Sequence, residues 1–404
     1  MMERNGVEAV TRLAERVLSV RPLAGVLPPP VAVASAAADP AEADAADRLL
    51  GRVAERVGAG PFRLLPAGEP APDVFAAVVA RRLDLSASWL RAAAPAAVDP
   101  REVAAAADDV VAQSLAAACR RAELVRPDGA RLTAYALGDP AAPAVVLASA
   151  CGMPVQLSER WVRRLAQTHH VVTWESRWLF GPDVAGGGGG PAGDPVAVPA
   201  PAVDVAAQAG DLLAVLDHFG VARAHLMGLC GGAVIALDAA VRWPERFTSM
   251  SLWHGDFELG PAAPKTDHQR NLQALLDMAR QGRDGAAAVH RVLYGSLVDR
   301  LPEDLAHLVI YPYATGELWY RYSLLNGAIM TTDVRAQLRR VALPTLVVTS
   351  ADDATAHPDG SIAVARGLAD TTLHIAPHGD HISLFRGPTE LIDLALDFLT
   401  GSRS

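Results

Sequence analysis

The stretch HLMGLCGGAV, residues 225–234, decides how this sequence folds, because it joins two kinds of regular structure through glycine. The apolar run that ends at Met227 is typical of a buried strand, and the alanine-rich run that continues to Pro244 is typical of a helix. Between them lies Gly-Leu-Cys-Gly-Gly, with Cys230 at its centre. We expect a tight strand–turn–helix here, in which the small residues let backbone segments approach closely.

The composition limits the classes of protein to which this chain can belong. The chain has 404 residues, 51% of them hydrophobic, so a sizeable core can be buried. The net charge of −9 and the lack of a basic block argue against nucleic acid as a partner. No segment resembles a signal peptide or approaches the roughly 20 apolar residues that span a bilayer. We therefore expect a cytoplasmic protein that does not associate with a membrane.

The cysteines do not form a structural framework. Cys119, Cys151 and Cys230 are too few and too scattered for a set of disulfides, and no C-x-x-C pair is present to suggest a zinc site. We expect three free thiols in a reducing compartment and no bound metal.

The alternation of strands and helices on both sides of the turn predicts an α/β fold with a mostly parallel sheet covered by helices on both faces. Helical periodicity in four windows, the last of them 103–124, precedes this pattern, and a strandless helical segment rich in aromatic residues interrupts it. A run of five glycines at 186–190 predicts a mobile loop. The predicted division is an N-terminal helical extension at 1–125, the first part of the core at 126–255, a helical cap at 256–335 and the second part of the core at 336–404.

This order of elements resembles the α/β-hydrolase superfamily over residues 126–400. The resemblance implies a nucleophile elbow in which Gly228 and Gly232 flank Cys230. It also implies a nucleophile–acid–histidine order along the chain. The acid follows the strand PTLVVTS, where Asp353 is the choice and Asp352 the reserve. The histidine precedes the last helix, and there His381 is preferred to His378.

The same resemblance implies the surroundings of the nucleophile. The oxyanion hole is expected to use the backbone N–H groups of Gly231, directly after Cys230, and of Met153, in the loop after the strand AVVLAS. Cys151, His254 and Tyr320 are candidates for the pocket.

A thiol nucleophile has a chemical consequence. His381 can take the thiol proton, and the positive end of the following helix favours the thiolate. Acylated cysteine is a thioester, which reacts with thiols and amines much faster than an oxoester does. Exchange between thioesters is also close to isoenergetic. A cysteine therefore suits reversible acyl transfer between thiols better than it suits simple hydrolysis.

GLCGG with Cys230, together with Asp353, His381, the long leader and the aromatic cap, resembles the aminoacyl-shuttling transferases of nonribosomal peptide biosynthesis, of the syringomycin and coronamic acid type. The resemblance implies transfer of an acyl group between phosphopantetheine thiols of donor and acceptor carrier proteins, without a bound cofactor. The cap carries basic residues that could form a dock for acidic carriers, namely Lys265, Arg270, Arg280 and Arg283.

Two other functions use the same residues. One is a hydrolase, either an editing thioesterase or an enzyme similar to dienelactone hydrolase, for which Arg177 or Arg321 could bind a free carboxylate. The other is a binding module that kept the fold without the activity. The hydrolase differs from the transferase in admitting water to the acyl-enzyme, and the binding module would have an unreactive Cys230.

Overall fold

The computed structural model forms two compact units. The structure describes residues 2–37, 40–66, 68–86, 99–181, 184, 201–293 and 302–401. The first unit contains Met1–Ala118, Pro182–Pro191 and His290–Gly316, and the second contains Cys119–Gly181, Ala192–Val289 and Glu317–Ser404. The predicted mobile glycine loop lies outside the described residues.

The first unit is mainly helical. Its central helix is α1, which buries Ala9, Val10, Leu13 and Val17 at helical spacing and contacts α2, α3, α5 and α12. Two short strands, β1 and β2, pair in parallel. The elements are α1 (Met2–Ala24), β1 (Val31–Val33), α2 (Pro40–Val57), β2 (Phe62–Leu64), α3 (Val74–Leu83), α5 (Pro100–Gln113), α6 (Leu115–Ala118), α12 (Ala306–Val309) and η4 (Tyr311–Tyr313).

The helix predicted at 103–124 is wrong in its second half. α5 stops at Ser114, whose backbone is extended, and only the single turn of α6 follows. Arg120–Val125 forms the strand β3, which pairs antiparallel with β4 in the main sheet. Half-buried and exposed positions alternate along most of β3, so its period is two rather than 3.6. The N-terminal extension therefore ends at residue 118, because this strand belongs to the second unit.

The second unit is built on an eight-stranded sheet with the order β10-β9-β8-β7-β5-β6-β4-β3. β3 and β4 are antiparallel to their neighbours, and all other pairs are parallel. The strands are β3 (Arg120–Val125), β4 (Arg131–Leu137), β5 (Ala144–Ala148), β6 (His170–Trp174), β7 (Ala224–Leu229), β8 (Phe247–Trp253), β9 (Thr345–Ser350) and β10 (Thr371–Ala376).

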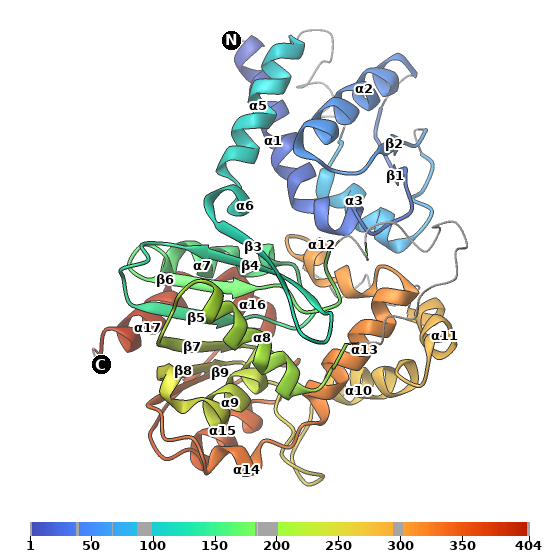
Figure 1. The fold of residues 1–404 in the computed structure, drawn as a ribbon. Coiled ribbons are helices and arrows are strands. Elements are labelled where there is room, and N and C mark those ends of the chain that lie inside the picture. The colour runs from blue at the N-terminus through green and yellow to red at the C-terminus, as the bar shows by residue number, and fades with distance from the viewer. Residues whose placement is uncertain are drawn as a thin grey trace. The chain divides into compact units, whose positions relative to one another are not determined.

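Helices cover both faces of this sheet (Figure 1). On one face α7 contacts α16 and α17, and on the other α9 contacts α8 and α14, which in turn contacts α15. The helices are η1 (Val155–Ser158), α7 (Glu159–Leu165), α8 (Val205–His218), α9 (Gly232–Arg242), η2 (Pro244–Arg246), α14 (Arg335–Leu338), α15 (Pro358–Gly367), α16 (His381–Arg386) and α17 (Thr389–Leu399). The predicted α/β fold, a mostly parallel sheet with helices on both faces, is confirmed.

The described residues between β8 and β9 are mainly helical, and part of them group with the sheet. This part includes α10 (Asp267–Ala279) and most of α13 (Gly316–Thr331), while α11 (Arg283–Leu293) crosses the boundary between the units. Thr266 and Gln269 form a capping box that fixes the start of α10. Across the described part of the chain, no helix is long and apolar enough to cross a membrane.

Candidate active site

Cys230 lies at the turn between β7 and α9. Its φ of 54° is in the left-handed region, which is strained for a residue with a side chain. The turn is held because the N–H of Cys230 donates to the carbonyl of Trp253 in the neighbouring strand at 2.9 Å. The Cys230 side chain is partly exposed, whereas the strand before it is fully buried.

The glycines of the elbow are required by close packing. A Cβ at Gly232 would lie 2.1 Å from the carbonyl oxygen of Ala148, and a Cβ at Gly228 would lie 2.6 Å from the Cα of Ala233. Neither contact can be relieved by turning a side chain, since both partners are backbone atoms. These two positions therefore let α9 start directly against the ends of β5 and β7.

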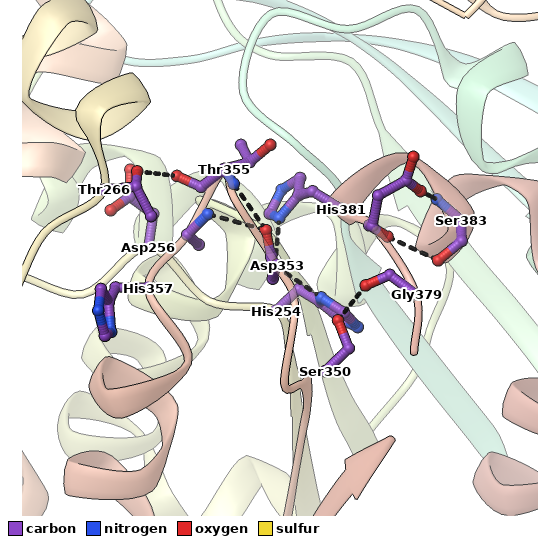
Figure 2. A network of polar contacts seen from close by, with 12 residues as sticks. His254, Asp256, Thr266, Ser350, Asp353, Thr355, His357, Gly379, His381 and Ser383 are labelled. Carbon is purple, nitrogen blue, oxygen red and sulfur yellow. Dashed lines mark hydrogen bonds and ion pairs between the residues drawn. The ribbon is translucent and has the colours of Figure 1, made fainter. Parts of the chain in front are cut away.

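Asp353 and His381 meet at the carboxyl ends of the strands (Figure 2). The Nδ1 atom of His381 is 3.1 Å from Oδ2 of Asp353, and both side chains are buried. Oδ1 of Asp353 accepts hydrogen bonds from the backbone N–H groups of Thr355 at 2.8 Å and Ala356 at 3.0 Å. Two backbone N–H groups thus fix Oδ1 of Asp353, and Oδ2 is directed at the imidazole of His381.

The charges at this site stabilise a protonated His381. Burial alone would lower the pKa of His381, but a thiolate at Cys230 and the carboxylate of Asp353 together raise it well above its usual value. The Nε2 atom of His381 is buried and makes no hydrogen bond of normal geometry. It lies close enough to Cys230 to sense the thiolate charge.

The reserve acid and histidine lie apart from this pair. Asp352 is exposed and accepts a hydrogen bond from the N–H of Gly379, and His378 is almost fully exposed beside it. The residue before His381, where a glycine is usual in the superfamily, is Asp380, which caps α16 by accepting from the N–H of Ser383 at 2.7 Å. Asp380 thereby places His381 in the first turn of a helix.

His254, expected in the pocket, is bound to the acid. Its Nδ1 atom is 2.8 Å from Oδ2 of Asp353, the same oxygen that faces His381. Figure 2 shows Asp353 between the two imidazoles. Burial opposes ionisation of Asp353, but the bonds from His254 and His381 hold its pKa well below the usual range. No sequence pattern predicted this contact, because it depends on the left-handed backbone of His254, whose φ is 47°.

The two backbone N–H groups expected in the oxyanion hole differ in their hydrogen bonds. In the described part of the chain, the N–H of Gly231 has no acceptor. The N–H of Met153 makes a long contact of 3.4 Å to the carbonyl of Ala150. The loop that carries Met153 is anchored because Gly152 donates its N–H to Oγ of Ser176 at 2.9 Å.

The two other thiols are held in the neutral form. Burial raises the pKa of Cys151, in the oxyanion loop, to about 12. Burial also raises the pKa of Cys119 to about 11. Neither thiol should be a strong nucleophile at neutral pH, because the thiolate is the reactive form.

Helix α13 supplies side chains over the elbow, of which Tyr322 was one of several aromatic candidates from the sequence, whereas Asn326 and Ile329 were not singled out. A Cβ at Gly231 would lie 3.4 Å from Ile329 and 3.6 Å from Asn326, and a Cβ at Gly152 would lie 2.8 Å from the ring of Tyr322. These positions recur at helical spacing, a signal that was visible in the sequence but did not show which face of the helix is used. Tyr320, the expected pocket residue, instead packs against Trp178 and beneath the guanidinium of Arg283.

The arginines considered for a free carboxylate already have partners. Arg177 is buried and bonds both oxygens of Asp211 at 2.6 Å, and it also binds Asp128. Arg321 donates to Glu317 and to the carbonyl of Trp178. The four basic residues of the cap segment are also paired with acidic residues: Lys265 with Glu258, Arg270 with Asp267, Arg280 with Asp277 and Arg283 with Glu317.

The histidines and the acid are close enough to consider a metal ion. Ligand atoms of His254, Asp353 and His381 lie within 4.8 Å of one another. Hydrogen bonds account for this closeness, however, because the Nδ1 atoms point at the carboxylate and not at a shared vacant point.

Sequence comparisons find hydrolases. The chain is 30% identical to a putative carbamate hydrolase RutD of Variovorax paradoxus over 48% of this chain and 73% of that protein. It is 28% identical to a protein of the same description from Pseudomonas savastanoi over 64% of this chain and 94% of that protein. It is 26% identical to 3-oxoadipate enol-lactonase 2 of Acinetobacter baylyi over 44% and 64% of the respective chains. No family model matches the chain.

Solved structures share the fold over 69% of this chain. A hydrolase from Pseudomonas aeruginosa PA01 aligns with a TM-score of 0.51 and 24% identity over 69% of this chain and 98% of that chain. An enol-lactonase from Burkholderia xenovorans LB400 aligns with a TM-score of 0.53 and 20% identity over 69% and 100%. At these identities the likeness extends to the fold alone.

Proposed function

This chain belongs to the α/β-hydrolase superfamily, and we propose that it is an acyltransferase that carries its acyl group as a thioester on Cys230. The observation that carries the proposal is the identity of the residue on the elbow. A thiol there, within range of His381 and Asp353, makes an acyl-enzyme that passes its acyl group to another thiol more readily than an oxoester would.

The first half-reaction loads the enzyme. The Cys230 thiolate attacks the carbonyl carbon of a donor thioester, and the oxygen becomes an oxyanion that the N–H groups of Gly231 and Met153 can stabilise. The long contact of the Met153 N–H to Ala150 would be exchanged for this oxyanion. When the intermediate collapses, the bond to the donor sulfur breaks and His381 gives its proton to the departing thiolate.

The second half-reaction reverses these steps with a different thiol. His381 removes the proton from the acceptor thiol, the acceptor sulfur attacks the Cys230 thioester, and Cys230 leaves as a thiolate beside protonated His381. One thioester bond is formed for each one broken, so the reaction needs no oxidant and no energy source. A thiolate at Cys230 and the carboxylate of Asp353 both raise the pKa of His381 and so favour the protonated imidazole that the next half-reaction needs.

An aminoacyl group fits the charges near the site. Asp256 follows β8 by a few residues and its carboxylate accepts a bond from Gln269 at 2.5 Å. Burial raises the pKa of Asp256, while Gln269 and the nearby His381 work in the opposite direction. The Asp256 carboxylate interacts electrostatically with the catalytic histidine, and it is our candidate for binding the ammonium group of an amino acid held as a thioester on Cys230.

The donor and the acceptor in this proposal are carrier proteins that present the acyl group on a phosphopantetheine arm. The arm explains why a thiol would accept and release the group. Each of the four basic residues of the cap is paired with an acidic residue. The proposed docking surface for the carriers therefore has charges of both signs and is not a free basic patch.

Hydrolysis is the second candidate, and the relatives favour it. Two of this chain's relatives are described as a putative carbamate hydrolase and an enol-lactonase. The same catalytic residues would serve a thioesterase if water reached the Cys230 thioester. The choice therefore depends on the fate of the acyl group.

The test follows that fate. The enzyme is mixed with a carrier loaded with an amino acid as its pantetheine thioester, and intact masses of all proteins are followed before and after a free-thiol carrier is added. We expect the amino acid to leave the enzyme only when the acceptor is added, and the acceptor to gain the same mass. Cys230→Ser is the matched control, because its oxoester reacts poorly with thiols and transfer should fall sharply. Rapid release of free amino acid without gain on the acceptor would instead establish the thioesterase.

A further inference from the structure

The carboxylate of Asp353 is fully occupied by four donors. Two backbone N–H groups bind Oδ1, and the Nδ1 atoms of His254 and His381 both bind Oδ2. The contact to His254, at 2.8 Å, is the shorter of the two, and the contact to His381 is 3.1 Å. In charge-assisted pairs the shorter bond is in general the stronger one. His381 therefore shares the acceptor oxygen of its acid with a second imidazole that lies at the shorter distance.

His254 is itself fixed in the same framework as the nucleophile. Its φ of 47° is left-handed, a conformation that costs about 1–2 kcal/mol in a residue with a Cβ. Its N–H donates to the carbonyl of Val348 in β9 at 2.8 Å, and the residue before it, Trp253, accepts the N–H of Cys230. The surrounding strands thus hold His254 in a strained conformation that aims its ring at Asp353.

We propose that His254 is a positioning residue that draws part of the negative charge of Asp353 away from His381. Because a carboxylate oxygen that already accepts a strong bond is a weaker partner for a second donor, the imidazolium of His381 is stabilised less than it would be by an unshared acid. His381 then gives its proton to a departing thiolate more easily. This inference deepens the proposed function, since an enzyme that exchanges one thiol for another must release that proton in each half-reaction.

Other charged groups also influence the titration of His381, independently of His254. The carboxylate of Asp256 and the ring of His268 on α10 both interact with it, besides Cys230 and Asp353. None of these groups changes when His254 is replaced, so a change in the titration of His381 reports the loss of the bond to Asp353.

The experiment measures the rate at which iodoacetamide alkylates Cys230 as a function of pH. Alkylation needs the thiolate and no acyl substrate. Iodoacetamide is neutral and the thiolate persists when His381 is deprotonated, so the upper limb of the profile is its second inflection, where loss of the His381 proton changes the reactivity of the thiolate. In His254→Leu, which removes the donor, we expect this limb to move up by about one pH unit, because Asp353 is no longer shared. His254→Asn is the matched control, since its amide nitrogen can donate from nearly the same place and asparagine tolerates a left-handed backbone. Its profile should match that of the unmodified protein.

A second measurement covers the case in which the leucine variant does not fold. In the unmodified protein labelled with ¹⁵N-histidine, two Nδ1–H protons bound to one carboxylate should appear downfield of the amide protons, and His254→Asn should remove one of them. An unchanged or lowered upper limb in a folded His254→Leu, or a single downfield proton, would overturn the proposal. If acyl transfer fails but the alkylation profile shifts as expected, then the proposed function is wrong while the role of His254 stands.

Discussion

Replacing Asp353 with asparagine should remove nearly all activity, and the structure shows why. The carboxylate accepts four hydrogen bonds, two on each oxygen, whereas an amide offers one accepting oxygen. If that oxygen stays with the N–H groups of Thr355 and Ala356, then the amide NH₂ faces the Nδ1 atom of His381. His381 can bond to it only by accepting at Nδ1, which places its proton on Nε2.

A His381 in that form cannot take the proton of Cys230. The loss that an inverted tautomer causes in Ser-His-Asp enzymes is about 10⁴-fold in turnover, equivalent to about 5.5 kcal/mol of transition-state stabilisation. A buried donor left unpaired in the variant also costs about 1–3 kcal/mol of folding stability, so urea unfolding should accompany the assay.

The matched control is Asp352→Asn. Asp352 is exposed and binds only the N–H of Gly379 and, at 3.4 Å, the ring of His378. We expect less than a tenfold change in the rate at which a donor thioester loads the enzyme, measured by intact mass. Comparable losses in the two variants, or a larger loss for Asp352→Asn, would refute the reasoning, since only Asp353 faces His381.

Three further predictions follow from separate features. Asp256→Asn should lower the rate of loading from an aminoacyl donor at least tenfold, because a charge-assisted bond contributes about 1.5–3 kcal/mol. Loading from an acetyl donor should stay unchanged, and equal effects on both donors would exclude an ammonium site. Gly232→Ala should reduce the free energy of unfolding, measured with urea, by about 3 kcal/mol or more, because its Cβ would lie 2.1 Å from the carbonyl oxygen of Ala148. Gly231→Ala is the control: the closest contact of its Cβ is 3.4 Å, so the free energy of unfolding should change by less than half as much. Burial lowers the pKa of His225 to about 3, so between pH 6.5 and 3 this histidine is protonated only in the unfolded chain. The free energy of unfolding should therefore decrease as the pH is lowered through this range, by up to about 1.4 kcal/mol per pH unit. His225→Asn should show a smaller decrease between pH 6 and 5.

The parts of the fold that could be predicted are those set by local pattern. The elbow could be found because a buried strand, a glycine-flanked residue and a helix follow one another within 20 residues. The pairing of Asp353 with His381 could be predicted because the resemblance to α/β-hydrolases implies an acid after the strand PTLVVTS and a histidine before the last helix, and the two side chains do meet. The strand β3 could not be found, because its charged, alanine-containing sequence suits a helix as well as an edge strand.

The surroundings of the site depended on contacts that periodicity does not encode. His254 was recognised as a candidate from its place after a strand, yet its bond to Asp353 depends on a left-handed backbone that no sequence pattern required. The aromatic positions of α13 were visible, but which face of the helix covers the elbow is decided by packing. Tyr322 lies against the oxyanion loop, whereas Tyr320 faces Trp178.

The most direct test of the account is to locate the acyl group on the enzyme. The protein is incubated with an aminoacyl pantetheine thioester without an acceptor, digested at low pH and mapped by mass spectrometry. The account predicts the amino acid on the peptide that contains Cys230, and none on Cys119 or Cys151, whose thiols burial keeps neutral. Free pantetheine added before digestion should discharge it. An adduct on either of the other cysteines, or loading that survives in Cys230→Ala, would contradict the assignment of Cys230 as the nucleophile.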